Sequence, residues 1–292
     1  MKHIVVCAGV LACTGVSVHG SAASAEDRAA EVLVMARAAL GGAKLDGIAG
    51  LSASGNFRRL MGDREIEGEL TVELAPPGRI RRTEHVGAPG GPSFTRVTAL
   101  NDGEFWSDGT NRGGGGFVAR LGGAGEARPP SEADRERFQQ MQQRRLQNEL
   151  NRFLLVWLLR SDTPVTHAGR AEAEDGSADV LEVRRDGASP VRLFLDSATH
   201  LPVMLTYEDA QPRMMGRRGR TGPPDPEEIR RRMAEPPRQA AFELRFDDYR
   251  SVDGVKLPHR LTQSVDGTAT EEWTIDRYRV NPRFKSNTFS KP

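Results

Sequence analysis

The stretch Asp179–Glu208 constrains the fold more than any other, because its apolar side chains recur at every second position. The alternating positions around the Asp186-Gly187 pair are Leu181, Val183, Val191, Leu193, Leu195, Leu201, Val203, Leu205 and Tyr207. Alternation puts side chains on one face of a pleated sheet, and Asp-Gly favours the positive φ angles of a tight hairpin turn. The stretch therefore predicts a three-stranded antiparallel meander with one apolar face.

The first 25 residues have the pattern of an export signal. Lys2 precedes the apolar run Ile4–Val18, which is short for a membrane span. The small residues Ala23-Ser24-Ala25 fit the rule for signal cleavage, so we expect residues 1–25 to be a signal peptide and the mature chain to begin at Glu26. The alternative is a lipoprotein signal in which Cys13 becomes a lipid anchor.

Cysteine and charge counts exclude several classes of protein. Both cysteines, Cys7 and Cys13, lie in the expected signal, so the mature chain would contain neither a disulfide nor cysteine metal ligands. The formal net charge is +1, which provides no overall field toward nucleic acid, and we expect no nucleic-acid partner. At this length we expect residues 26–292 to form one domain.

Two segments have helical spacing. Glu26–Leu40 begins with two acids, which favour a helix N-terminus, and is followed by Gly41-Gly42 as a stop. Ser131–Arg160 is the predicted long helix, and its last part, Phe153–Leu159, is apolar on all sides. Such a segment must be covered on every side. It is either a core helix packed on a sheet or a lid over an apolar cavity.

Most of the remaining chain alternates as strands do. In the clearest example, the apolar positions of residues 65–74 alternate with four glutamates and Thr71, and they are Ile66, Gly68, Leu70, Val72 and Leu74. Asp-Gly pairs recur at positions 46, 102, 108, 175, 186, 253 and 266. Short alternating runs between such turns favour an antiparallel sheet without βαβ units. The fold class is therefore mainly β (α+β), an open antiparallel sheet with an N-terminal helix and a mid-chain helix.

Two stretches contain little that a core could bury. Residues 110–130 are rich in glycine, and residues 209–239 contain eight arginines among prolines and glycines. Such compositions favour mobile loops. The arginines of the second loop are favoured to be a solvated surface, and the alternative is a contact for an anionic membrane surface or an envelope membrane protein.

Several turn and strand motifs together point to a family. They are Leu193-Phe-Leu-Asp196, Thr199-His-Leu-Pro202, Phe246–Tyr249, Val252-Asp-Gly-Val-Lys-Leu-Pro258, Trp273-x-Ile275, Tyr278-x-Val280-Asn-Pro282 and Phe289. They resemble the outer-membrane lipoprotein-sorting and periplasmic lipoprotein carrier group, over nearly all of residues 26–292. The resemblance implies a periplasmic protein whose strongly curved sheet, an unclosed half-barrel, surrounds an apolar cavity with helices as a lid.

Catalytic and metal-binding patterns are absent from the sequence. The four histidines beyond the expected signal have neither HxH nor HExxH spacing, and they are His85, His167, His200 and His259. The adjacent acids Glu271-Glu272 and Asp247-Asp248 point to opposite faces of a strand, which is poor geometry for acid–base catalysis. We expect a protein that is not an enzyme, with no catalytic residues, no metal site and no cofactor.

Two function classes remain. The first is a periplasmic carrier that shields a lipid or a lipoprotein acyl chain between the inner and outer membranes, hiding about 0.8 kcal/mol per CH2 from water. The second is an envelope sensor or regulatory binding domain on the same scaffold. For the carrier, the candidate residues of the cavity wall are Leu51, Phe57, Leu70, Val72, Phe94, Trp106, Phe153, Trp157, Leu193 and Leu205.

Overall fold

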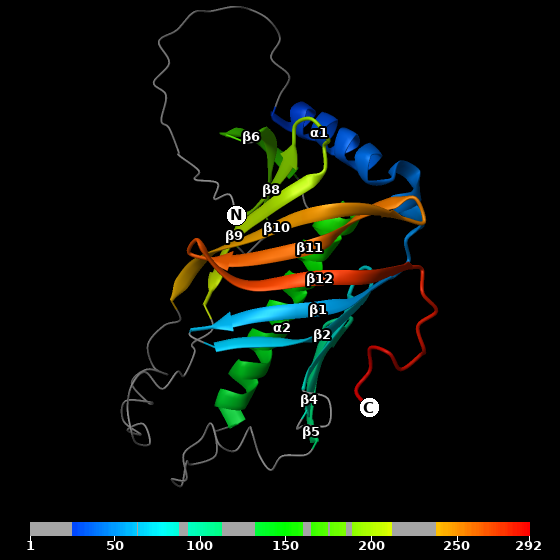
Figure 1. Cartoon of the computed structure of the whole chain (residues 1–292), viewed down its shortest axis with the longest axis vertical. Coiled ribbons are helices and arrows are strands. Elements are labelled where there is room, and N and C mark those ends of the chain that lie inside the picture. The colour runs from blue at the N-terminus through cyan, green and yellow to red at the C-terminus, as the bar shows by residue number, and fades with distance from the viewer. Residues whose placement is uncertain are drawn as a thin grey trace, which may run out of the picture.

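The computed structural model describes residues 25–62, 64–87, 93–112, 132–159, 165–174, 176–184, 189–211 and 238–292. Within these ranges twelve strands form one antiparallel sheet in the order β5-β4-β3-β2-β1-β12-β11-β10-β9-β8-β7-β6 (Figure 1). The two edge strands, β5 and β6, do not pair with each other, so the sheet is open. The predicted fold class is confirmed.

The strands are β1 (Leu51–Met61), β2 (Arg64–Ala75), β3 (Arg79–Gly87), β4 (Ser93–Asn101), β5 (Glu104–Arg112), β6 (Val165–Ala173), β7 (Gly176–Val183), β8 (Val191–Asp196), β9 (Pro202–Ala210), β10 (Gln239–Val252), β11 (Val255–Val265) and β12 (Thr268–Val280). The helices are α1 (Ala25–Leu40), the 3-10 helix η1 (Gly42–Gly47) and α2 (Glu132–Leu158). None of the helices in the described ranges is long and apolar enough to cross a bilayer.

The strand order explains the position of α2. The chain moves outward from β1 to the edge strand β5, then resumes at the opposite edge with β6 and returns inward to β12, which pairs with β1. Helix α2 lies between β5 and β6 in the sequence, and it crosses behind the central strands in Figure 1. Its 27 residues give a length of about 40 Å. The face that α2 covers is called the inner face below.

Side chains of the first five strands line up on the inner face. Leu51 pairs with Leu74, Leu74 with Ile80, Ile80 with Leu100, and Leu100 with Phe105. The first four of these are fully buried, and Phe105 packs against the same core. The glutamates of β2 occupy the other parity and point outward, as the alternation predicts.

The predicted meander is formed by β7, β8 and β9. Its Asp186-Gly187 turn lies outside the described residues. The alternation of β9 breaks at Val203, because pairing with β8 moves from Met204 directly to Pro202. Val203 packs against an outer cluster of Val180, Phe194 and Met204, so the prediction that it shares a face with Leu205 is wrong, and the meander has apolar side chains on both faces.

Three of the Asp-Gly pairs form the expected hairpin turns. The φ angles are 49° and 96° at Asp102-Gly103, 52° and 82° at Asp253-Gly254, and 48° and 77° at Asp266-Gly267. Asp108-Gly109, in contrast, lies inside β5, where Gly109 leaves room for the ring of Phe94. Asp46-Gly47 ends the 3-10 helix η1.

Helix α1 closes one end of the inner face. Its buried residues Ala29, Val32, Ala36 and Leu40 recur at helical spacing, as predicted, and join the same core as the sheet. Helix α1 packs mainly on the edge strand β6, and Arg28 lies 3.4 Å from the buried carboxylate of Asp179 on β7.

The signal peptide and most of the two expected loops fall outside the described residues. At the loop margins, residues 110–112 belong to β5, residues 209–210 to β9, and Gln239 to β10. The ordered strands therefore extend a little further than the composition indicates.

Candidate ligand-binding site

The C-terminal half of α2 is buried on the inner face. Every residue from Phe153 to Leu159 is at most 8% exposed, so this apolar segment is covered on all sides, as its sequence requires. The ring of Phe153 stacks on Trp157 at 4.4 Å between centroids and lies 5.8 Å from Trp273 on β12. Trp157 in turn meets Tyr278 edge-on at 5.7 Å. Helix and sheet thus meet through aromatic rings.

Two polar ring nitrogens lie unsatisfied in this apolar interior. Nε1 of Trp157 and Nε2 of His259 have no hydrogen-bond partner among the described residues. His259 uses its other nitrogen, Nδ1, at 2.6 Å from the carbonyl oxygen of Ile275, and its ring lies 5.1 Å from that of Tyr278. An unsatisfied buried polar group costs about 1–3 kcal/mol. The interior around Tyr278 therefore offers one donor and one ring nitrogen to a polar atom.

A cluster of charges lies on the inner face beside the aromatic rings. Arg82 on β3 forms an ion pair with Glu84 at 2.6 Å and donates to Glu271 on β12 and to Glu149 on α2, at 2.9 and 3.1 Å. Arg59 on β1 donates to Glu84 at 2.8 Å and reaches both oxygens of Glu271 at 3.0 Å. These five residues are called the ionic cluster below.

The ionic cluster keeps its carboxylates charged. Burial opposes the ionisation of Glu271, but attraction to Arg82 and hydrogen bonds from Arg59 outweigh it and lower the pKa to about 2. The pKa of Glu84 is lowered in the same way against its own burial, by Arg82 and Arg59. Carboxylates held ionised inside ion pairs are poor proton donors and acceptors at neutral pH. The ionic cluster is therefore suited to holding elements together.

Arg82 also joins the ionic cluster to the rings, because its guanidinium lies 4.8 Å from the centroid of Trp273. A second cation–π contact connects α2 to the far half of the sheet, where the guanidinium of Arg152 lies 4.0 Å from the ring centroid of Tyr207 on β9. Helix α2 is thus attached to both halves of the inner face through side chains.

Eight of the ten predicted wall residues come together. They belong to a single core cluster on the inner face and beneath or within α2, and they are Leu51, Phe57, Leu70, Val72, Phe153, Trp157, Leu193 and Leu205. Leu193 and Leu205 pair directly across β8 and β9. Leu70 and Val72 lie on β2, beside the ionic cluster residues of β3.

Phe94 and Trp106 do not join that cluster. Phe94 is half-buried on the inner face at the start of β4, next to Gly109. Trp106 lies on the opposite face, where its Nε1 donates to the carbonyl oxygen of Phe289 at 2.7 Å. Adjacent strand residues face opposite sides, and here Phe105 takes the inward position that the prediction assigned to Trp106.

The five residues of the ionic cluster were not among the predicted site residues. The signal was present in the alternation, because Arg82 and Glu84 have the parity of the inward residues Ile80 and Val86. Charges at core parity indicate a buried ion-pair network or a functional site. The prediction that Glu271 and Glu272 face opposite sides is confirmed, since Glu271 joins Arg59 inside and Glu272 joins Arg58 outside.

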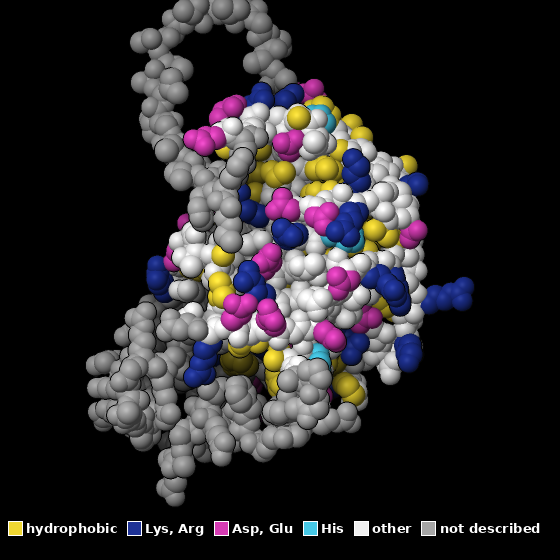
Figure 2. Space-filling view, viewed as in Figure 1, with side chains coloured by type: hydrophobic (Ala, Val, Ile, Leu, Met, Phe, Trp, Pro, Cys, Tyr) yellow, Lys and Arg dark blue, Asp and Glu magenta, His cyan; other side chains and the backbone are white. Residues whose placement is uncertain are grey.

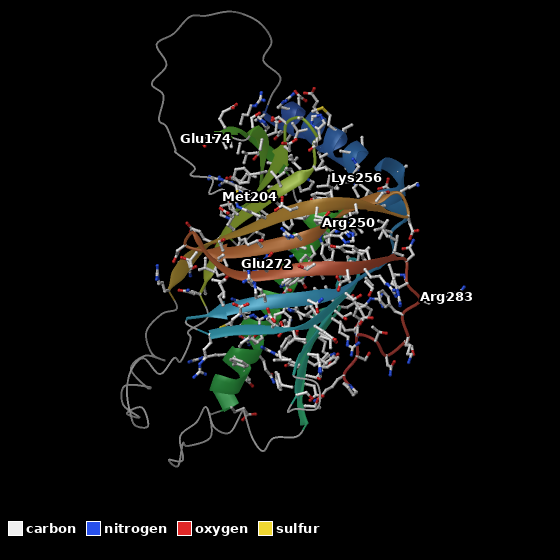
Figure 3. All side chains as sticks on the ribbon, in the orientation of Figure 1. Glu174, Met204, Arg250, Lys256, Glu272 and Arg283 are labelled. Atoms are coloured by element: carbon white, nitrogen blue, oxygen red, sulfur yellow. The ribbon has the colours of Figure 1, made fainter. Side chains whose placement is uncertain are left out.

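The outer face has a different character. Figure 2 shows acidic and basic side chains intermixed over the central strands, and Figure 3 marks Glu272 and Arg250 among them. A hollow of about 640 Å³ lies here over β1, β2, β3 and β12, and its lining includes Arg58, Glu67, Glu69, His85 and Glu272. It is polar and open to solvent. In the part of the chain that the structure describes, no group of three His, Cys, Asp or Glu side chains converges as a metal site would require.

Comparison with known proteins gives matches to solved structures. Neither a protein-family profile nor a curated protein matches the sequence. A domain described as an outer membrane lipoprotein-sorting protein, from Vibrio parahaemolyticus, is 12% identical with a TM-score of 0.45, covering 91% of this chain and 97% of its own. A LolA superfamily protein from Nitrosomonas europaea is 9% identical with a TM-score of 0.46, covering 90% and 97%. A DUF1329 family protein from Desulfovibrio piger is 10% identical with a TM-score of 0.45, covering 90% and 97%.

Two of these structures belong to the lipoprotein-sorting group that the sequence motifs resemble. Identities of 9–12% and TM-scores near 0.45 carry no argument about function. The function is therefore derived below from this chain's own residues.

Proposed function

We propose that this chain is a binding protein, not an enzyme, which shields an acyl chain between α2 and the inner face of its sheet. The observation that supports this most is the contact between the all-apolar segment Phe153–Leu159 and the aromatic rings of β12. In this proposal α2 is a lid, and the eight clustered wall residues line the space that opens when it moves. Since the sequence left core helix and lid as alternatives, the lid is part of the proposal.

Helix α2 can separate from the sheet without breaking a strand ladder. The sheet is a continuous ladder from β5 to β6 in which α2 takes no part. The attachments of α2 that run through side chains include the Arg82–Glu149 ion pair, the Arg152–Tyr207 contact and a hydrogen bond from Gln143 to the carbonyl oxygen of Gly103. Each of these side-chain contacts can form again after α2 moves. Separating two strands, in contrast, would leave backbone N–H and C=O groups without partners.

An acyl chain would compensate for the apolar contacts that α2 gives up. At about 0.8 kcal/mol per CH2, a twelve-carbon chain gains roughly 9 kcal/mol on leaving water. Displacing Trp157 and Phe153 from the inner face exposes comparable apolar area, because aromatic side chains bury about 150–250 Å² each. The exchange is therefore close to balanced, which is what reversible uptake and release require.

The cellular setting follows from the sequence. An export signal in residues 1–25 would deliver the protein to the periplasm, where lipids and lipoproteins must cross water between two membranes. The arginines of residues 209–239 supply a contact for an anionic membrane surface or an envelope membrane protein that donates or accepts the cargo.

Binding of a fluorescent fatty-acyl probe tests the proposal. The purified chain is stripped of lipid, the extract is analysed by mass spectrometry, and the probe is titrated into the stripped protein. Saturable binding is expected, and Trp157→Ala should weaken it while costing less stability than the roughly 3–5 kcal/mol of a large core truncation. Trp106→Ala is the matched control, because it removes the same side chain from the outer face and should leave probe affinity unchanged.

If the chain is instead a sensor or regulatory domain, the same experiment is expected to give the opposite result. If the inner face is a permanently filled core, the stripped wild-type protein binds no probe, and Trp157→Ala destabilises by the full amount of a core truncation. That pair of results would replace the carrier by a domain that binds a fixed envelope partner.

A further inference from the structure

Positive charge exceeds negative charge around the ionic cluster. Its three carboxylates, Glu84, Glu149 and Glu271, all accept hydrogen bonds from Arg82 or Arg59. Two more arginines lie nearby, since Arg96 interacts electrostatically with Glu84, Arg82 and Arg59 of the cluster and with Arg145 of α2. Among the described residues, this group therefore contains four guanidinium groups and three carboxylates.

Arg96 comes from β4 and shares the inner face with the ionic cluster. It stands opposite Glu84 in the ladder between β3 and β4. Glu84 is already engaged by Arg59 at 2.8 Å and by Arg82 at 2.6 Å, and Arg96 makes no hydrogen bond or ion pair within the described ranges. Partial loss of contact with water lowers the pKa of Arg96, although the residue stays exposed, and the neighbouring charges of Arg82, Arg145 and Arg59 lower it further against the opposing pull of Glu84. An anion beside Arg96 would offset both effects.

Arg96 lies between the solvent and the apolar interior, which is where the head group of a bound amphiphile would lie. The side chain keeps access to solvent, and its ladder neighbour on the edge strand is Gly109, which has no side chain to cover it. Phe94 lies two residues along β4 on the same face, and its ladder partner Val86 packs against the core cluster. Helix α2, which contributes Arg145, packs across β3, β4 and β5 here.

We propose that the site binds an anionic amphiphile, with its carboxylate or phosphate head group at Arg96 and Arg145 and its acyl chain beneath α2. This inference rests on the proposed function and adds the class of ligand. A guanidinium donates two parallel hydrogen bonds to a carboxylate or phosphate, which a neutral head group cannot accept as strongly. Glutamates of the ionic cluster already accept from Nε and Nη2 of Arg59 and from both Nη atoms of Arg82, and Nε of Arg82 is buried without a partner. Arg96 and Arg145 have no hydrogen bond or ion pair within the described ranges, so these two are the arginines left for the ligand.

Matched probes of equal chain length test this proposal. Dodecanoic acid, dodecyl phosphate and the neutral 1-dodecanol are titrated into the lipid-stripped full chain by calorimetry, with inorganic phosphate as a head group without a chain. We expect the two anionic amphiphiles to bind about tenfold more tightly than dodecanol, equivalent to about 1.4 kcal/mol. Inorganic phosphate alone should bind far more weakly than dodecyl phosphate.

The variants Arg96→Gln and Arg145→Gln identify the head-group site. Each should reduce the anionic preference several-fold while leaving dodecanol affinity unchanged. Arg279→Gln is the control, because Arg279 is an exposed arginine on the outer face of β12 and should keep the full preference. Thermal unfolding establishes that each variant folds, and Arg96→Lys, which keeps the charge, should retain part of the preference.

Each negative result overturns a different part of the proposal. Equal affinity of the wild type for dodecanoic acid and dodecanol overturns the anionic head group and leaves the acyl carrier intact. A preference that survives in both Arg96→Gln and Arg145→Gln overturns the assigned residues. Inorganic phosphate binding as tightly as dodecyl phosphate shows a free-anion site and overturns the amphiphile. Absence of binding by all three amphiphiles overturns the proposed function itself.

Discussion

Nη1 of Arg82 on strand β3 lies 3.1 Å from Oε1 of Glu149 on helix α2. The same guanidinium holds Glu84 and Glu271 within the sheet, so one side chain connects the helix to β3 and β12. We expect Glu149→Gln to lower the free energy of unfolding by about 1–3 kcal/mol, because it removes a charge-assisted hydrogen bond from a mostly buried arginine. Urea unfolding measures the change.

The control for this variant is Glu69→Gln. Glu69 is an exposed glutamate on the outer face of β2, and its neutralisation should stay within about 0.5 kcal/mol of the wild type. Equal losses for the two variants would show that Glu149 does not hold α2 to the sheet.

The ionic cluster predicts that the free energy of unfolding falls in acid because Glu271 becomes protonated. The folded state lowers the pKa of Glu271 from its ordinary value of 4.5 to about 2, so the stabilisation is complete above pH 4.5 and is lost as the pH falls to about 2. A shift of this size corresponds to roughly 3 kcal/mol. The unfolding free energy of Glu271→Gln should therefore fall less steeply between pH 5 and pH 2 than that of the wild type. Parallel pH profiles for the two proteins would contradict the assignment.

Close packing at Gly55 gives a prediction about the sheet itself. A Cβ at this position would lie 2.0 Å from the carbonyl oxygen of Thr274, at the point where pairing between β1 and β12 shifts register. Gly55→Ala should cost about 1–3 kcal/mol or more, since backbone atoms must move. Gly47→Ala is the comparison, because a Cβ there meets nothing within 4 Å. Thermal melts that show similar losses for both would refute this view of the β1–β12 junction.

Alternation in the sequence predicts most of the sheet, because side-chain parity is a local property of each strand. It predicts Leu70 and Val72 on β2, and Leu193 and Leu205 across β8 and β9. It fails at Val203, where a register shift moves a residue to the other face. The sequence of a single strand does not predict such a shift, since the shift depends on how two strands pair.

The site is less predictable than the sheet, because it joins residues far apart in the sequence. Trp106 and Phe105 are both apolar, and only the pairing of Leu100 with Phe105 decides which of them faces inward. Arg59, Arg82 and Glu271 come from three strands, and Glu149 from α2. The parity of Arg82 shows that it points inward, but its partners depend on the order of strands in the sheet.

The central claim is that an acyl chain occupies the inner face beneath α2. The protein has three tryptophans, of which Trp157 and Trp273 lie on the inner side and Trp106 on the outer face. Two single-tryptophan proteins are made by changing the other two tryptophans to phenylalanine, one keeping Trp157 and one keeping Trp106. Both residues are at most 8% exposed, so free quencher in solution reaches both of them poorly.

The measurement is fluorescence quenching by dodecanoic acid brominated near the end of its chain, which quenches indole on contact. We predict saturable quenching of the protein that keeps Trp157 and none of the protein that keeps Trp106. Quenching of Trp106 as strong as that of Trp157, or quenching of neither, would contradict the claim that the chain enters beneath α2.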